Sequence, residues 1–311
     1  MATTVSALPK WARLHNPMSA RTLQFDALSH IWRGVQEKVA PAAEPACVHA
    51  RTFWRRLTSN PATALLSGSR FCLDECLQPA LEDALRKVRS KTKPASVNHR
   101  VPLGLMLLSR QQVTPGQLTE ALDAQRVAGR GRIGEWLIAL GCVSEEQVIA
   151  AVARQWSCPV LRPSSSIPRP DRLPPIPLAL MQVGSMIPIG YVPATATLYF
   201  AFGECIDHNL LYSVERMTDC HTEPCFAAPS FIQHALLSLM DQKLRREELV
   251  FECESNLPEL ARIVRSYCAR LSAREIRIVD AGAYTWIRLL RGQRLLLDLL
   301  FRAPIRQDHD C

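Results

Sequence analysis

Arginine and glutamine side chains between residues 100 and 155 have the chemistry to recognise an anionic nucleotide. Arg132 can stack on a base or form a bidentate hydrogen bond with a phosphate, and Gly134 allows close approach to the backbone. Gln125 and Gln155 can donate and accept at the edges of a base. For a single arginine or glutamine, a solvated surface position is the simpler interpretation. The duplicated placement of glutamine and glycine makes binding worth considering.

An internal repeat with a period of thirty residues places these side chains twice. The matching positions are Leu103/Ile133, Gly104/Gly134, Leu107/Leu137, Leu108/Ile138, Val113/Val143, Leu118/Val148, Leu122/Val152 and Gln125/Gln155. Thr114 with Gln117 and Ser144 with Gln147 form capping boxes, so each pair starts a helix. A shorter helix with one apolar face precedes each box. Because equal caps and equal apolar spacings require equal backbones, residues 100–157 are predicted to form two superposable αα-hairpins.

The second copy reads Arg132-Ile-Gly134, Leu137-Ile138, Gly141-Cys-Val143, Val148, Val152 and Gln155. This pattern resembles the tandem motif of the MshEN domain, the N-terminal domain of type II secretion and type IV pilus assembly ATPases of the GspE kind. The resemblance is strong over about residues 100–155 and weaker to about residue 239, where an α/β unit follows in those proteins. It implies binding of cyclic di-GMP and docking on the cytoplasmic part of a secretion-system membrane protein.

The resemblance implies a ligand site built from both copies of the repeat. The expected ligand-binding residues are Arg100, Leu103, Gly104, Leu107, Gln125, Arg132, Ile133, Gly134, Leu137, Gly141 and Gln155. The first copy departs from the pattern, with Pro102 in place of arginine and Gln111 in place of the second glycine. Arg100 could supply the missing guanidinium. We therefore expect the second half-site to be the better preserved one.

The whole sequence predicts an α+β protein with four regions. These are a helical N-terminal region and linker (1–97), the tandem helical repeat (98–160), a small α/β subdomain (161–243) and a C-terminal α+β segment (244–311). Helices are predicted at Asp74–Arg89, Asn209–Met217, Ser230–Met240 and Leu257–Leu271. Strands are predicted at Met186–Val192, Thr197–Phe202, Glu248–Cys253, Glu275–Val279, Thr285–Leu290 and Leu295–Phe301.

Composition excludes several classes of protein. With 48% hydrophobic and 21% charged residues among 311, the chain has the composition of a globular protein. It lacks the roughly 18 uninterrupted apolar residues that a membrane-spanning helix needs. Residues 1–18 contain no apolar core of a secretory signal, so we expect a cytoplasmic location that a partner could make peripheral at the inner membrane. The net charge of +8 favours anionic partners.

Other chemical motifs are weak. Gly129 to Gly134 spells G-x-G-x-x-G, but it follows a predicted helix instead of a strand, which argues against dinucleotide binding. No G-x-x-x-x-G-K-[ST] loop occurs, so the chain is not expected to hydrolyse ATP. Two cysteine pairs could suggest a zinc site: Cys72 with Cys76, and Cys220 with Cys225 on either side of His221. Neither pair has a second pair of ligands nearby, so we expect these cysteines to be free thiols. Trp136 fits an apolar pattern as a core residue. We assign no catalytic residue, metal or cofactor.

Three functions remain in competition. The first is a non-enzymatic regulatory or adaptor protein that binds cyclic di-GMP, docks on a secretion or pilus machine, or does both. The second is a pure protein-interaction scaffold whose nucleotide site has decayed, as Pro102 and Gln111 suggest. The third is nucleic-acid binding through the basic segments Arg51–Arg56 and Arg86–Lys93, although no recognised nucleic-acid module or aromatic strip accompanies them.

Overall fold

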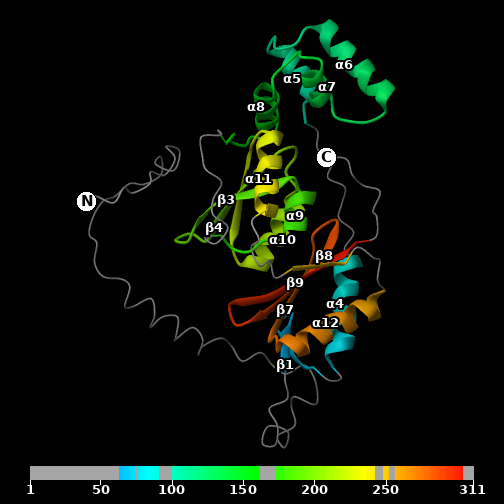
Figure 1. The fold of residues 1–311 in the computed structure, drawn as a ribbon, viewed down its shortest axis with the longest axis vertical. Helices are drawn as coiled ribbons and strands as arrows, with labels where there is room; N and C mark the ends of the chain where they lie inside the picture. Colours follow the sequence, from blue (N-terminus) through cyan, green and yellow to red (C-terminus); the bar gives the residue numbers. More distant parts are fainter. Residues whose placement is uncertain are drawn as a thin grey trace, which may run out of the picture. The chain divides into compact units, whose positions relative to one another are not determined.

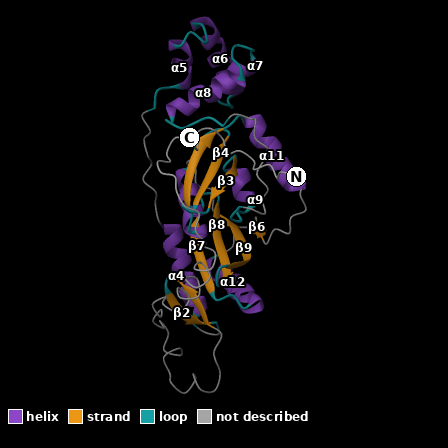
Figure 2. Ribbon diagram, turned by 90° about the vertical axis from the view of Figure 1, so that its left-hand side faces the viewer, coloured by secondary structure: helices purple, strands orange, loops and turns teal. Residues whose placement is uncertain are grey.

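The computed structural model describes residues 63–73, 76–90, 100–161, 173–241, 248–251 and 256–303, all within the unit Pro45–Cys311. They form helices and two β-sheets, which confirms the predicted α+β class (Figures 1 and 2). In these ranges, no helix combines the length and apolar character needed to cross a membrane. The basic segment Arg51–Arg56 and most of the predicted linker lie outside the described residues.

The tandem repeat consists of four helices. They are α5 (Leu103–Ser109), α6 (Pro115–Ala128), α7 (Ile133–Ala139) and α8 (Glu145–Gln155). Both capping boxes form: the Thr114 hydroxyl accepts from Gln117 N and the Ser144 hydroxyl from Gln147 N, each at 3.3 Å. The helices of the two copies start thirty residues apart, which is the period of the sequence repeat.

The helices of the two copies pack against each other. Helix α5 packs against α8, and α7 packs against α6, so the first helix of each copy contacts the last helix of the other. The buried core is symmetric at the thirty-residue offset and comprises Leu107 with Leu137, Val113 with Val143 and Ala121 with Ala151. A shared core of this kind makes the two copies one folding unit.

A three-stranded sheet follows the repeat, with the order β3-β4-β5. Its elements are α9 (Leu178–Val183), β3 (Met186–Val192), β4 (Thr197–Phe202), α10 (His208–Thr218), β5 (His221–Phe226) and α11 (Pro229–Asp241). Strands β3 and β4 form an antiparallel pair, and α10 is the crossover between the parallel strands β4 and β5. The sequence did not predict β5, because Pro224 and the surrounding polar residues obscure the strand pattern. Proline is tolerated here because β5 is an edge strand.

A six-stranded sheet has the order β2-β1-β7-β8-β9-β6. Its strands are β1 (Thr63–Leu66), β2 (Ser69–Cys72), β6 (Glu248–Phe251), β7 (Glu275–Asp280), β8 (Tyr284–Arg291) and β9 (Arg294–Arg302). Helices α4 (Leu77–Ser90) and α12 (Leu257–Leu271) pack side by side and share a core with this sheet (Figure 1). Leu77, Leu81 and Leu85 are fully buried, as their helical spacing predicted.

Residues 1–97 were predicted to be helical, and within the described part of this region Leu77–Ser90 is helix α4 but residues 63–72 are not helical. Residues 63–72 form a β-hairpin, and β1 pairs in parallel with β7 through Leu65 with Glu275 and Leu66 with Ile276. Each strand of the hairpin has four residues, too few for a clear alternation of apolar and polar positions. The hairpin therefore belongs to the sheet that the C-terminal segment builds.

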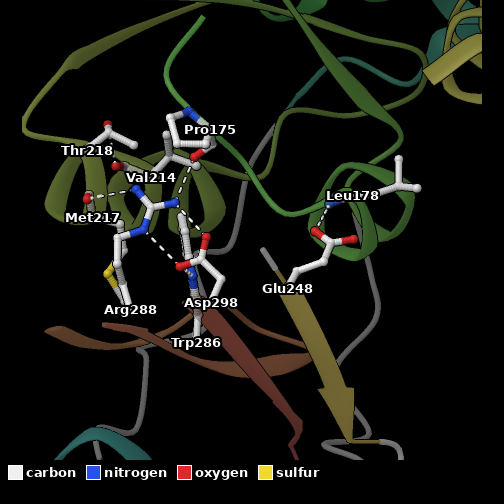
Figure 3. A network of polar contacts seen from close by, with 9 residues as sticks. All are labelled: Pro175, Leu178, Val214, Met217, Thr218, Glu248, Trp286, Arg288 and Asp298. Atoms are coloured by element: carbon white, nitrogen blue, oxygen red, sulfur yellow. Dashed lines mark hydrogen bonds and ion pairs between the residues drawn. The ribbon is translucent and has the colours of Figure 1, made fainter. Parts of the chain in front are cut away.

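A buried ion pair joins this sheet to the preceding α/β unit (Figure 3). Arg288 on β8 donates to both carboxylate oxygens of Asp298 on β9, each at 2.8 Å, and both side chains are 3% exposed. The same guanidinium donates to Met217 O at the end of α10 (3.1 Å) and to Pro175 O (2.7 Å). Trp286 Nε1 donates to Asp298 at 2.9 Å. The charges are thus paired and hydrogen-bonded, which burial requires.

Candidate functional site

Two loops related by the repeat open its two copies: residues 100–102 before α5 and residues 130–132 before α7. Gln155 Nε2 at the end of α8 donates to Val101 O at 2.6 Å. Gln125 Nε2 on α6 donates to Gly131 O at 2.8 Å. Val101 and Gly131 are thirty residues apart, as are the glutamines, so each copy fixes the loop that opens the other. The structure gives both predicted ligand glutamines a positioning role.

The predicted glycines and leucines of the site lie at helix contacts and in the core of the repeat. A Cβ atom on Gly104 would lie 2.8 Å from Leu118 Cδ1, and one on Gly134 would lie 3.0 Å from Val148 Cγ1. These contacts are again equivalent at the thirty-residue offset, so both glycines allow close helix packing. The remaining apolar site residues are core or border positions, with Leu107 and Leu137 fully buried and Leu103 and Ile133 packed around them.

The turn that follows each short helix has the same backbone in both copies. Gly141 has φ = +69°, and Gln111 at the equivalent position has φ = +58°. The following hydrogen bonds also match, since Gln112 N donates to Leu107 O at 3.0 Å and Cys142 N to Leu137 O at 2.9 Å. The substitution of glycine by Gln111 therefore leaves the course of the chain unchanged.

The loop of the second copy carries the charged part of the site. Arg132 Nη2 lies 3.5 Å from Glu204 Oε2, and the two side chains are 48% and 46% exposed. The backbone N–H of Arg132 donates to Glu135 Oε2 at 3.3 Å. Arg130, Gly131, Glu135, Trp136 and Ala139 line an adjoining hollow of about 260 Å³.

Trp136 is the site residue that the sequence did not identify. Its ring is half-buried, and Nε1 donates to Arg130 O at 3.1 Å, which holds the ring against the loop. The sequence spacing could have identified it, because Trp136 follows Arg132 by four residues and residues at this spacing share a helix face. The apolar pattern around Trp136 pointed to the core instead.

The loop of the first copy is arranged differently. The Arg100 guanidinium carbon lies 3.1 Å from the centroid of the Trp156 ring, a cation–π contact. Burial lowers the pKa of Arg100 from its ordinary value. Trp156 in turn contacts Phe226 on β5, with ring centroids 6.0 Å apart. With Pro102 uncharged, this loop has one arginine where the second loop has Arg130 and Arg132.

Glu145 forms another contact between the repeat and the α/β unit. Its carboxylate, in the first turn of α8, accepts from the backbone N–H of Ser230 at 2.9 Å and from the Ser230 hydroxyl at 2.6 Å. Ser230 lies in the first turn of α11, where a carboxylate satisfies free backbone donors and interacts favourably with the helix dipole.

The cysteine clusters considered from the sequence do not assemble a site. In the described ranges, no group of three or more His, Cys, Asp or Glu side chains could hold a metal ion. Burial raises the pKa of Cys225 to about 12, and Cys220 is also buried, whereas His221 is 65% exposed. His221 faces carboxylates instead, with Glu215 at 3.1 Å and Glu223 at 3.4 Å.

No protein-family model and no curated protein matches the chain. A solved structure described as "Structure of MshE with cdg" is 28% identical; the match covers 45% of this chain and 99% of that chain, with a TM-score of 0.38. Two structures of the N-terminal domain of XpsE are 18% and 19% identical, each match covering 47% of this chain and 97% of theirs, with TM-scores of 0.35 and 0.26. At these TM-scores the matches identify no ligand or partner.

Proposed function

We propose that this chain is a non-enzymatic regulatory or adaptor protein whose tandem repeat binds cyclic di-GMP. The carrying observation is the reciprocal pair of glutamine contacts, which hold the loops at Val101 and Gly131 in equivalent positions beside arginines. Cyclic di-GMP is a roughly twofold dianion with two guanine faces. Two equivalent loops can each receive one half of such a ligand.

The second half-site supplies the strongest contacts in this proposal. The Arg132 guanidinium is half-exposed and can form charge-assisted hydrogen bonds with a phosphate. The neighbouring hollow is lined by Arg130 and by the half-buried ring of Trp136, and both groups can stack on a base. In the first half-site Arg100 is the available charge, and a ligand would meet it over the Trp156 ring.

Docking on a type II secretion or type IV pilus-like machine is the second part of the proposal. It is supported by the resemblance of the tandem motif to MshEN and GspE N-terminal domains. The absence of a phosphate-binding G-x-x-x-x-G-K-[ST] loop supports a role without ATP hydrolysis. Direct binding of the chain to the purified cytoplasmic part of an inner-membrane assembly protein tests this part.

Calorimetric titration of the full chain with cyclic di-GMP tests the ligand. We expect Arg132→Ala to weaken binding about ten- to a hundredfold, because a hydrogen bond to a charged group is worth roughly 1.5–3 kcal/mol. The matched control is Arg126→Ala, since Arg126 is 76% exposed and pairs with Asp123 on its own helix. Equal losses in both variants would indicate diffuse attraction of an anion. Absence of heat at high micromolar ligand would refute the ligand proposal.

A protein-interaction scaffold with a decayed nucleotide site is the alternative. Pro102 and the engagement of Arg100 with Trp156 favour it, since they leave the first half-site with less charge than the second. The two functions are separated by Pro102→Arg, which restores the arginine of the motif. Tighter cyclic di-GMP binding in this variant supports a working site, whereas partner binding without any nucleotide response supports the scaffold.

A further inference from the structure

We infer that Glu204 belongs to the ligand site as an internal competitor, whose carboxylate occupies Arg132 until a ligand phosphate displaces it. This inference rests on the proposed function, since it describes how the same site is regulated. Glu204 comes from the α/β unit and not from the repeat, and Arg132 Nη2 lies 3.5 Å from its Oε2 atom. The expected binding residues from the tandem motif do not include it.

The turn that carries Glu204 is fixed by its own unit. Gly203 N donates to Ser185 O at 3.0 Å, and a Cβ atom on Gly203 would lie 3.3 Å from Pro229 Cα. Asp207 then caps α10 by accepting from Asn209 N at 2.9 Å and Leu210 N at 3.0 Å. Because the turn is held at both ends, the backbone of Glu204 stays in place when the Arg132 side chain turns to a ligand.

The Arg132–Glu204 ion pair is weak enough for a ligand phosphate to displace it. Arg132 and Glu204 are each about half exposed, and partly solvated ion pairs of this kind are weak. A phosphate offers the guanidinium a bidentate partner of at least equal charge. Glu204 therefore lowers the affinity for the anion without abolishing it.

Displacement of Glu204 also changes the contact between the repeat and the α/β unit. The Glu145–Ser230 contact and the Trp156–Phe226 contact do not involve Arg132, so they persist when the Arg132–Glu204 pair opens. Binding is thereby coupled to one attachment of the repeat. Since such coupling is reciprocal, weakening this attachment must strengthen ligand binding.

A double-mutant cycle with cyclic di-GMP tests the inference. Glu204→Gln keeps the shape of the side chain and removes its charge, and we expect about two- to fivefold tighter binding to the full chain. In an Arg132→Ala background the same substitution should bring no gain. Glu120→Gln, which removes an exposed carboxylate from α6, is the charge-matched control and should leave affinity unchanged.

The outcomes separate this inference from the proposed function. If the wild type and Glu204→Gln bind cyclic di-GMP with equal affinity, the inference is overturned and the proposed function stands. An equal gain with and without Arg132 also overturns it, because the effect is then one of general charge. Failure of the wild type and of Glu204→Gln to bind overturns both. Far-ultraviolet circular dichroism checks that each variant is folded.

Discussion

At the scale of single residues, Gln111 and Gly141 show how a sequence departure can be absorbed. Both have positive φ, at +58° and +69°, in a turn that is otherwise identical in the two copies. A side chain in this left-handed region costs roughly 1–2 kcal/mol relative to the ordinary helical region, and glycine avoids that cost. The first copy therefore keeps the turn at the expense of stability.

Gln111→Gly should stabilise the protein. We expect a gain of about 0.5–1 kcal/mol in the free energy of unfolding, since relief of backbone strain exceeds the added entropy of the unfolded chain. The reverse change, Gly141→Gln, should destabilise by a similar amount; a Cβ atom there meets nothing within 4 Å, so only backbone strain contributes. Urea unfolding monitored by circular dichroism measures both. A loss of stability in Gln111→Gly would show that the Gln111 side chain makes a favourable interaction.

Cys225 should be an unreactive thiol in the folded protein. Burial raises its pKa to about 12, so the nucleophilic thiolate is scarce at pH 8. Iodoacetamide should leave Cys225 unlabelled until urea unfolds the chain, as peptide mass spectrometry would show. The folded state holds this proton to higher pH than the unfolded chain does, so stability should fall as pH rises from about 9 toward 12. Rapid labelling of Cys225 at pH 8 without unfolding would contradict the burial.

At the scale of elements, polar contacts connect parts of the chain that are distant in sequence. Arg288 on β8 reaches the last turn of α10, where cations are favoured by the helix dipole, and also Pro175 before α9. A second contact comes from β6, where Glu248 Oε2 accepts a hydrogen bond at 2.8 Å from Leu178 N at the start of α9 (Figure 3). The Ser213 hydroxyl on α10 also donates to Asp280 O of β7 at 2.8 Å, so β6, β7 and β8 all form hydrogen bonds with the α/β unit.

Asp298→Asn should be strongly destabilising. It leaves the Arg288 charge buried without its carboxylate, and removal of one partner of a buried pair typically costs about 3–5 kcal/mol. Asp83→Asn is the control, because the Lys87–Asp83 pair is exposed and should contribute less than about 1 kcal/mol. The double variant Arg288→Met with Asp298→Leu should recover much of the loss in urea unfolding. A loss below about 1 kcal/mol in Asp298→Asn would mean that Arg288 is not effectively desolvated.

At the scale of the whole molecule, segments from before and after the tandem repeat complete one sheet. Strand β1 covers the edge of β7, and α4 packs beside α12 over the same core. The repeat and the α/β unit are therefore inserted between two parts of a single layered structure. Hydrophobic burial in this sheet depends on both ends of the described chain.

Removal of residues 1–90 should selectively weaken the six-stranded sheet. It uncovers the edge of β7 and the face of α12 that Leu77, Leu81 and Leu85 bury. Amide hydrogen exchange should accelerate in β7 and α12, while α5 to α8 keep their protection because their core is separate. The control removes residues 1–60 and retains the hairpin and α4. Unchanged exchange in β7 after the longer deletion would show that the hairpin adds little to this sheet.

The sequence by itself determined the local structure and the repeat. Helix caps, apolar spacing and strand alternation act over a few residues, so the helices within 100–157, the strands Met186–Val192 and Thr197–Phe202 and the helix Leu257–Leu271 were predictable. The thirty-residue period also revealed which residues are equivalent. From that equivalence came the two candidate glutamines, whereas Arg132 came from the resemblance of the second copy to the MshEN motif.

Only the tertiary structure decided which distant residues meet. The pairing of β1 with β7, the packing of α5 against α8 and the placement of Glu204 against Arg132 join segments far apart in the chain. Such contacts leave no local pattern, because a short apolar strand or a single surface glutamate can pair with many partners equally well. Their choice depends on how the buried faces of all the elements fit together.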